Sequence, residues 1–476
     1  MLFNKIEFAL FFPIVLILYW YVFRKNLKQQ NIFLLAASLF FFGCFDWLFL
    51  ILLVFSIGLD FIVAHKIHKS REHKKAWLWF SIIVNLCFLG FFKYFNFFID
   101  NFSALLSFFG LQSNNWSLKI ILPVGISFYT FHGLSYVIDV YNGKIKPVKS
   151  LIDYSLFVSF FPLLVAGPIE RATHLLPQIQ KNRDFKYSNA VSGLRQILWG
   201  LVKKIIIADN CAVYVNQVFE GPSEYSGSSL AIAAVLFSFQ IYGDFSGYSD
   251  IASGTARMLG FELLKNFSFP YFSRDIAEFW RRWHISLSSW FRDYVYIPLG
   301  GSRGSKYESI RNVFIIFLLS GFWHGANWTF IFWGLLHALF FIPLLLTGNN
   351  RSNLDIAAPT DIKAGIQTFC QIGFTFTLVT FAWIFFRADS LTFALDYIKS
   401  MASASFFSFP EIFPKTVLGY IFLFIMVEWY GRNDTYAIEK FGLTWRRRYR
   451  ISFYYLLTLI VLYFYGKDFQ FLYFQF

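Results

Sequence analysis

One histidine in this sequence has surroundings that suit acid–base chemistry. His324 stands in "SGFWHGANW", at the end of a short apolar stretch, with Gly321 and Gly325 around it and Asn327 after it. Such a stretch predicts a helix that stops inside a membrane, which is tolerated only where the chain lines a protein-enclosed cavity. There a neutral imidazole could remove a proton from a hydroxyl nucleophile. His324 is therefore the first candidate for a catalytic residue.

A second histidine, His284, lies in "FWRRWHISLSSWFRDYVYIPLGGSRGSK", residues 279–306. At helical spacing the large apolar side chains share one face: Trp280, Trp283, Leu287 and Trp290 or Phe291. The basic side chains lie largely elsewhere: Arg281, Arg282 and Arg292. This pattern predicts an amphipathic helix in the cytoplasmic interface, with its basic residues toward lipid headgroups. A histidine on such a helix is more often structural than catalytic.

The end of that segment, "GGSRGSK" (300–306), could hold a phosphate through backbone N–H groups and Arg303 or Lys306. It does not have the spacing of a P-loop, because Ser305 separates Lys306 from Gly304. A basic, glycine-rich turn is the simpler interpretation.

Two acidic residues lie just past an apolar run in "FQIYGDFSGYSDIASGTARMLG" (239–260). Asp244 and Asp250 are candidates for a functional role because a carboxylate beside the membrane interior is expensive. A helix-end cap is an equally good interpretation. The glycines between them, at 243, 247 and 254, permit either a close helix approach or a broken helix. His337 follows His324 by thirteen residues and is interpreted as a packing residue.

Several kinds of site are excluded by their missing motifs. The chain has no HExxH, no GxSxG elbow and no Rossmann fingerprint. Its four cysteines show no CxxC spacing, so neither a zinc site nor a disulfide framework is supported, and we expect no metal. The net charge of +14 resides in short loops between apolar runs, which is typical of the positive-inside rule and not of a nucleic-acid-binding face.

The elements that must position these residues are membrane helices. Of the 476 residues 57% are hydrophobic and only 15% are charged, whereas soluble domains average about 25% charged residues. The apolar residues form runs near the ~20 residues that a spanning helix needs. We predict an all-α polytopic membrane protein with about eleven to thirteen membrane segments, some of them re-entrant, in a single domain over residues 1–476, with residues 239–340 as its catalytic core.

Basic loops predict how this domain is oriented. "RKNLKQQ" (24–30) and "HKIHKSREHKK" (65–75) are both rich in Lys and Arg and are therefore assigned to the cytoplasm, which places the N-terminus outside. "TWRRRYR" (444–450) precedes the last apolar run, so the aromatic end "FQFLYFQF" (469–476) should also emerge outside. From the residues alone, an aromatic belt at the outer interface explains this ending.

Four stretches resemble the membrane-bound O-acyltransferase (MBOAT) family, and most of all its bacterial branch that O-acetylates alginate, peptidoglycan and other envelope polysaccharides. They are "MLFNKIEFALFFP", "QIYGDFSGYSDIA", "NFSFPYFSRDIAEFWRRWHISLSSWFRDYVYIPLGG" and "GFWHGANWTFIFWG", within residues 1–340. The resemblance implies helices around a thin central region pierced by a tunnel. It also implies that His324 is the catalytic centre and that His284 is required.

The resemblance also implies a reaction. The acyl donor, acetyl-CoA in this branch or a carrier-protein thioester in the D-alanylating relative, enters from the cytoplasm of a bacterium whose inner membrane holds the protein. We expect Arg282, Trp283, Arg303 and Lys306 to bind it. The ending "FLYFQF" matches a C-terminal Phe-x-Tyr-Phe motif of the branch, whose tyrosine, here Tyr473, is proposed to carry the acyl group. A phenol can be activated by a base, and its ester is a good acyl donor. An extracytoplasmic partner, of SGNH-hydrolase type, would pass the group to the polymer.

Two other functions stay open at this point: a polysaccharide exporter or flippase, and a scaffold of a synthase complex. The scarcity of acids and amides in the apolar runs disfavours a wide polar path. If the protein is an enzyme, three reactions stay open: O-acetylation of an alginate-like polymer, O-acetylation of peptidoglycan, and D-alanylation of teichoic acid.

Overall fold

The computed structural model describes residues 1–70, 72–111, 117–165, 167–357, 362–466, 469 and 471–472, and in these residues every regular element is a helix. The prediction of an all-α protein is therefore confirmed. The described chain forms two compact units, Met1–Ala190 with Ala256–Leu264, and Val191–Thr255 with Lys265–Phe476. The single domain over residues 1–476 stays a prediction.

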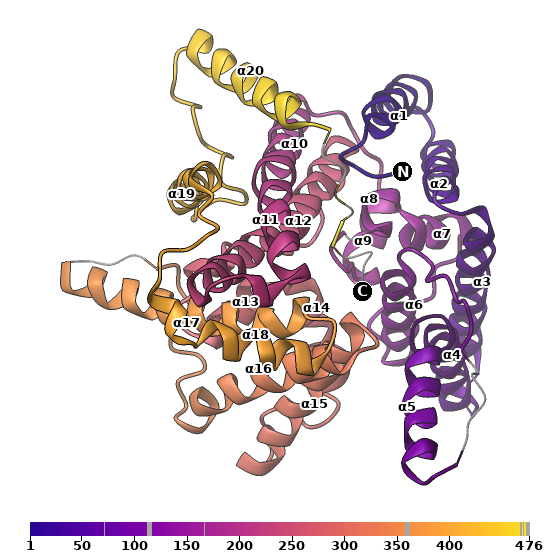
Figure 1. Ribbon diagram of the computed structural model, residues 1–476. Coiled ribbons are helices and arrows are strands. Elements are labelled where there is room, and N and C mark those ends of the chain that lie inside the picture. Colours follow the sequence, from indigo (N-terminus) through magenta and orange to yellow (C-terminus); the bar gives the residue numbers. More distant parts are fainter. Residues whose placement is uncertain are drawn as a thin grey trace. The chain divides into compact units, whose positions relative to one another are not determined.

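The first unit holds the helices up to residue 190 (Figure 1). They are α1 (Ile6–Ile17), η1 (Leu18–Val22), α2 (Leu27–Gly43), α3 (Trp47–Lys69), α4 (Lys74–Leu89), η2 (Gly90–Tyr94), α5 (Phe95–Phe108), α6 (Ile126–Tyr141), α7 (Leu151–Ser159), α8 (Phe161–Leu164) and α9 (Ala172–Ile179). Helix α10 (Tyr187–Leu201) continues from this unit into the second one.

The second unit holds the remaining helices. They are η3 (Val202–Ala208), α11 (Asp209–Glu220), η4 (Pro222–Glu224), α12 (Gly227–Met258), η5 (Pro270–Phe272), α13 (Ile276–Arg282), α14 (Ile285–Phe291), η6 (Arg292–Tyr296), α15 (Lys306–His324), α16 (Trp328–Leu346), α17 (Ile362–Arg387), α18 (Leu391–Met401), η7 (Ala404–Phe407), α19 (Lys415–Tyr430) and α20 (Arg447–Phe464). The last turn of α12 belongs to the first unit.

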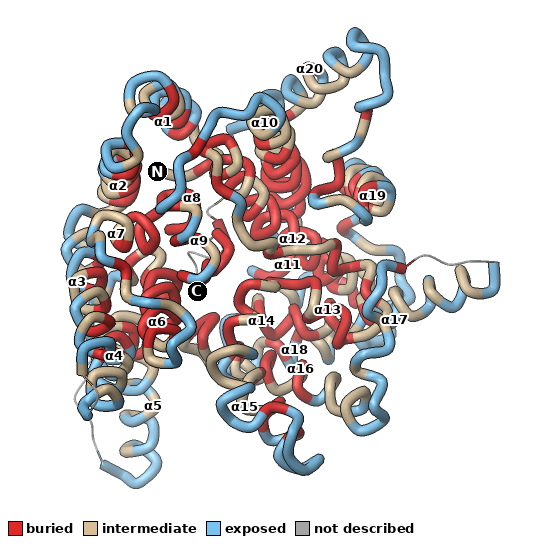
Figure 2. Tube along the Cα trace, turned by 180° about the vertical axis from the view of Figure 1, so that it is seen from behind, coloured by how far each residue is buried: buried red, intermediate tan, exposed pale blue. Residues whose placement is uncertain are grey.

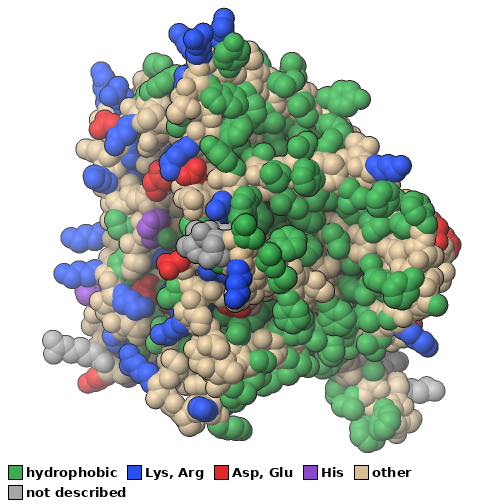
Figure 3. Space-filling view, turned by 90° about the vertical axis from the view of Figure 1, so that its left-hand side faces the viewer, with side chains coloured by type: hydrophobic (Ala, Val, Ile, Leu, Met, Phe, Trp, Pro, Cys, Tyr) green, Lys and Arg blue, Asp and Glu red, His purple; other side chains and the backbone are tan. Residues whose placement is uncertain are grey.

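Five helical stretches of the described chain are long and apolar enough to cross a membrane: Trp47–Lys69, Lys74–Phe108, Gly227–Met258, Trp328–Leu346 and Ile362–Arg387. Hydrophobic side chains cover much of the face seen in Figure 3, and Lys and Arg side chains gather along its left-hand edge. Exposed apolar residues of this kind, such as Phe369 and Phe422, suit a lipid environment. The prediction of a multi-pass membrane protein is confirmed, and the count of eleven to thirteen segments stays a prediction.

In the first unit, α3 packs on α4 and α6 around a buried carboxylate. The Asp60 carboxylate accepts hydrogen bonds from the Ser81 hydroxyl (2.7 Å) and the Asn85 amide (2.9 Å), both on α4. Gly133 brings the backbone of α6 against the same carboxylate, because a side chain at that position would collide with it. Asp60 therefore joins three helices.

In the second unit, α12 is the central element and is buried over most of its length (Figure 2). It runs unbroken through its glycines, which pack against the backbone of α10 and η3. A methyl group at Gly254 would strike the Gly193 carbonyl oxygen, and one at Gly247 the Gly200 carbonyl oxygen. The close-approach interpretation of these glycines is thus confirmed, and the broken-helix interpretation is wrong.

Candidate active site

The hairpin of α15 and α16 presents His324 (Figure 1). Helix α15 ends at His324 because Gly325 is fully extended, and α16 begins after Asn327, whose side chain accepts from the Thr329 N–H (3.0 Å). The two helices touch backbone to backbone, since a methyl group at Gly321 would collide with the Phe330 carbonyl. The predicted end of a helix at His324 is confirmed. The turn therefore aims this imidazole into the unit.

The ring of His324 is buried among aromatic side chains. It meets Trp333 and Phe386 edge-on, each at 5.2 Å between ring centroids, and Trp323 at 5.0 Å. Trp333 in turn packs on His337, which is buried and accepts a hydrogen bond from the Trp280 indole (3.2 Å). This contact agrees with the interpretation of His337 as a packing residue.

His284 lies beside His324, with ring centroids 6.4 Å apart. Its backbone is left-handed (φ 43°), a strained conformation for a residue with a side chain, and the segment around Asn266 holds it there. Asn266 donates its side-chain N–H to the Ser249 hydroxyl (3.0 Å), so its amide oxygen accepts from Nδ1–H of His284 (3.0 Å) and from the Ser286 hydroxyl (2.8 Å). The Asn266 carbonyl also accepts the Ile285 N–H.

These bonds fix the protonation of His284. Nδ1 carries the proton, and Nε2 is buried without a hydrogen bond in the described part of the chain. Burial lowers the pKa of this imidazole to about 3, so it is neutral at physiological pH. His284 therefore presents an unprotonated nitrogen, which can accept a hydrogen bond.

The left-handed residue also corrects a prediction. The segment 279–306 does not begin with one amphipathic helix, because α13 ends at Arg282 and α14 starts at Ile285, with Trp283 extended between them. The side chains of Trp280, Trp283, Leu287 and Trp290 are all buried in the unit. An interfacial helix with this apolar face toward lipid is therefore wrong. Sequence periodicity could not reveal a break of two residues.

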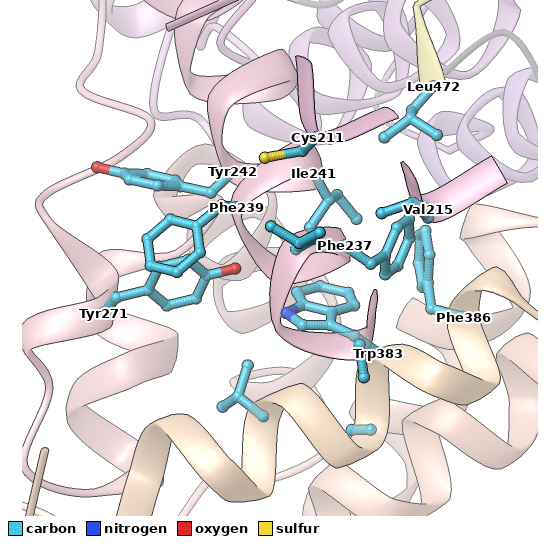
Figure 4. Packing of buried hydrophobic residues seen from close by; sticks show 14 of the residues in the cluster. Cys211, Val215, Phe237, Phe239, Ile241, Tyr242, Tyr271, Trp383, Phe386 and Leu472 are labelled. Carbon is cyan, nitrogen blue, oxygen red and sulfur yellow. The ribbon is translucent and has the colours of Figure 1, made fainter. Parts of the chain in front are cut away.

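A small cavity adjoins His324. Its lining residues come from α12, the α13–α14 break, α15, α17 and the C-terminal segment: Ile241, Asp244, Phe245, Trp283, His324, Trp383, Phe386, Phe471 and Leu472. Its volume of about 20 Å³ is enough for roughly one water molecule. Leu472, on the C-terminal segment, lines this cavity together with Ile241 and Phe386, and Figure 4 labels all three side chains. The cavity thus joins the histidine to the end of the chain.

The predicted site residues are distributed unequally around this cavity. His324 and Trp283 line the cavity. The ring of His284 contacts Phe245, which also lines it, and Trp323, which precedes His324 in the chain. Tyr473 lies outside the described residues, although Leu472 directly before it lines the cavity.

The basic residues expected to bind the donor are not gathered there. Arg282 is paired with the Glu278 carboxylate (2.7 Å), and its neighbour Arg281 donates to the backbone carbonyls of Asn350 and Asn353. Arg303, in the turn before α15, and Lys306, the first residue of α15, are both exposed, and Lys306 lies about 27 Å along that helix from His324 at ~1.5 Å per residue. A role in donor binding stays a prediction for Arg282, Trp283, Arg303 and Lys306.

The buried charges beside the cavity were only partly predicted. Asp244 and Asp250 do not cap a helix end, because both lie inside α12: Asp244 pairs with Lys204 (2.6 Å) and Asp250 with Lys203 (2.5 Å). Asp209 is a second partner of Lys204 (2.8 Å). The two lysines were overlooked, although "VKKIII" interrupts an apolar run with two charges, which is itself a signal of function. Asn266 carried no such signal.

Comparisons with known proteins agree with this geometry. The family model of the membrane-bound O-acyltransferases matches residues 144–377. A probable alginate O-acetylase, AlgI, of Pseudomonas aeruginosa is 36% identical over 91% of this chain and 82% of its own length. The chain belongs to the membrane-bound O-acyltransferase family. The predicted acyltransferase activity is thereby confirmed over an exporter or a scaffold.

Two further relatives of this acyltransferase carry other names. The peptidoglycan O-acetyltransferase of Helicobacter pylori is 36% identical over 84% of this chain and 80% of its own length. The teichoic acid D-alanyltransferase of Bacillus subtilis is 32% identical over 46% of this chain and 58% of its own length. The similarity to the acetyl-transferring relatives therefore extends over far more of the chain.

Proposed function

We propose that this acyltransferase takes an acetyl group from acetyl-CoA in the cytoplasm and passes it across the bacterial inner membrane, by way of Tyr473, for O-acetylation of an alginate-like exported or cell-envelope polysaccharide. The observation that carries the proposal is the cavity that His324 shares with Phe471 and Leu472. Tyr473 follows Leu472 directly in the chain. A base and the segment that bears a hydroxyl nucleophile therefore belong to one pocket.

The chemistry needs one base and one displacement. His324 takes the phenol proton of Tyr473 as the phenol oxygen attacks the thioester carbonyl. The carbon–sulfur bond breaks, the tyrosyl ester forms, and His324 returns the proton to the departing thiolate. His284, whose Nδ1–H is held by Asn266, offers only an acceptor at Nε2, so we assign it to orienting a hydroxyl or amide group of the reactants.

The aromatic surroundings support this division of roles. Because the cavity beside His324 has room for only about one water molecule, the tyrosyl ester is shielded from bulk water while it forms. Arg303 and Lys306, exposed at the far end of α15, are suited to the phosphates of the donor outside the membrane core. An extracytoplasmic transferase of SGNH type then consumes the ester at the outer face, where we place both termini.

The relatives favour acetyl transfer over D-alanyl transfer, because those named for alginate or peptidoglycan O-acetylation match most of the chain. The test uses the full-length protein in lipid nanodiscs with isotope-labelled acetyl-CoA and maps the label by mass spectrometry. We expect an ester on Tyr473 in the native protein and none in His324→Ala. Label that persists in Tyr473→Phe would overturn the relay while leaving the enzyme intact. Supplying D-alanyl carrier protein in parallel distinguishes the donors.

A further inference from the structure

We propose that Asp244 and Lys204 form a positioning site for the C-terminal segment, in which the Asp244 carboxylate holds the backbone of Leu472 and so sets where the next residue, Tyr473, meets the reaction. We call Asp244, Lys204, Phe245 and Tyr248 the tail anchor. The inference rests on the proposed function for the role of Tyr473. The holding of the segment itself rests on contacts of described residues.

The central contact is a hydrogen bond between distant parts of the chain. The N–H of Leu472 donates to Oδ2 of Asp244 at 2.8 Å, and both residues are buried. A hydrogen bond to a charged carboxylate is about twice as strong as one between neutral groups. Because the donor is a backbone group, the bond fixes the register of the segment whatever side chain position 472 carries.

Lys204 holds the carboxylate in place. Its ammonium lies 2.6 Å from Oδ1 of Asp244 and 2.8 Å from Oδ1 of Asp209. One oxygen of Asp244 is thereby occupied and the other is directed at the C-terminal segment. Asp209 lies five residues from Lys204 and already supplies a counter-charge, so charge compensation alone does not require Asp244.

The sequence brings this lysine to α12 by two devices. Lys204 lies in η3, a π-helical stretch, and such stretches are frequent at functional sites. Gly243 and Gly247 let η3 touch α12, because a methyl group at Gly243 would strike the Lys203 carbonyl oxygen and one at Gly247 would lie only 3.2 Å from the Lys204 backbone nitrogen. The glycines of α12 therefore bring Lys204 close enough to pair with Asp244.

Apolar contacts along the same face of α12 complete the tail anchor. The ring of Phe471 packs on Tyr248 (5.0 Å) and Phe245 (6.4 Å), residues one helical turn apart. Phe245 meets the ring of His284 edge-on at 4.7 Å. Leu472 points into the cavity toward Ile241 (Figure 4). The C-terminal segment is thus held by the Leu472–Asp244 hydrogen bond and by apolar contacts of the Phe471 and Leu472 side chains, close to His284 and His324.

The sharpest test removes the donor and leaves the carboxylate. Leu472→Pro has no backbone N–H, whereas its matched control Leu472→Ala keeps the donor and loses only the side chain. Hydrogen exchange of the C-terminal peptide is measured by mass spectrometry on the full-length protein in nanodiscs. We expect exchange of the remaining tail amides to rise at least about tenfold in Leu472→Pro, as loss of one hydrogen bond to a charged group implies, and to rise less in Leu472→Ala.

Two variants of the acceptor complete the test. Asp244→Ala should accelerate tail exchange as Leu472→Pro does, and Asp244→Asn, which keeps an acceptor oxygen, should restore most of the protection. Labelling of Tyr473 should fall in parallel with protection. Unchanged exchange in both Leu472→Pro and Asp244→Ala would overturn the tail anchor. If Asp244→Ala does not fold, the Leu472 pair decides alone.

The proposed function fails in a different way. If Leu472→Pro accelerates exchange but label persists in Tyr473→Phe, the tail anchor stands and the acyl relay is wrong. If Tyr473→Phe removes the label while tail exchange is insensitive to both Leu472→Pro and Asp244→Ala, the relay stands and the tail anchor is wrong.

Discussion

The two units bury the same kinds of residue in different surroundings. In the first unit, Asp60 accepts from Ser81 and Asn85, and His132 accepts the backbone N–H of Glu170 at 3.1 Å. In the second, Asp244 pairs with Lys204 and accepts the N–H of Leu472, which lies 228 residues away. His324 lines a cavity with that same residue.

The difference teaches that a buried ionisable residue does not mark a site by itself. Asp60 joins neighbouring helices and His132 holds the backbone segment before α9, whereas Asp244 and His324 line a cavity together with the C-terminal segment. Burial of an ionisable group costs free energy and therefore suggests a function, but the partners of that group decide whether its role is structural or catalytic. Substitutions in each unit can test this contrast.

The first prediction compares two buried histidines. His324→Ala should lower acyl transfer per folded molecule by about 10²–10⁴-fold, the usual contribution of a general base. His132→Ala should do the reverse, costing about 1–3 kcal/mol of stability for the stranded Glu170 N–H and leaving specific activity unchanged. Both are measured by labelled acetyl transfer and thermal unfolding in detergent. A His132→Ala variant that folds but has lost activity would remove the contrast.

The second prediction concerns the carboxylate of the first unit. Asp60→Ala removes the acceptor of the Ser81 hydroxyl and one of the acceptors of the Asn85 amide, so we expect a loss of about 1–3 kcal/mol in stability. Activity per folded molecule should stay native, in contrast to Asp244→Ala. The readout is the thermal midpoint together with transfer activity of the monodisperse fraction. Native stability in Asp60→Ala would contradict the joining role.

The third prediction compares two helix glycines. Gly247→Ala should separate η3 from α12, costing about 1–3 kcal/mol by overpacking and weakening the Lys204–Asp244 pair. Gly58→Ala, on α3 of the first unit, meets no atom within 4 Å and should stabilise the helix by about 0.5–1 kcal/mol. Thermal unfolding measures both changes, and tail hydrogen exchange should rise in Gly247→Ala alone.

The fourth prediction is that two histidines, one in each unit, make the stability of the protein depend on pH in opposite directions. Burial lowers the pKa of His284 to about 3, so between pH 6.5 and 3 the unfolded chain binds the extra proton, and stability falls as pH falls by up to about 1.4 kcal/mol per unit. The hydrogen bond from His174 to Glu170 (2.8 Å) raises the pKa of His174 in the first unit, so its contribution is present at low pH and lost as pH rises through that pKa.

The corresponding variants separate these contributions. Thermal midpoints recorded from pH 4.5 to 8 should fall less steeply toward low pH in His284→Gln than in the native protein. In His174→Gln they should fall more steeply. If the thermal midpoints of the two variants depend on pH in the same way, the opposite contributions of His284 and His174 are wrong.

Local signals in the sequence were enough for some features of the site. Gly325 and the capping side chain of Asn327 lie within three residues of His324, so the end of α15 could be predicted there. The break at Trp283 could not, because Asn266, which holds His284 in its left-handed conformation, lies 18 residues away. Asp244 was ambiguous for the same reason, since Lys204 and Leu472 are both remote in the chain.

The class of protein and the residue types of its chemistry follow from the amino-acid sequence. Run length and charge depletion dictate membrane helices, because only helices satisfy their own backbone groups in lipid, and short motifs single out His324 and His284. Only the tertiary structure decided which buried groups meet: His324 with Phe471 and Leu472 at one cavity, and Asp244 with Lys204 and the Leu472 N–H. Periodicity describes one helix at a time, whereas partners for a buried charge are chosen by packing between helices far apart in the chain.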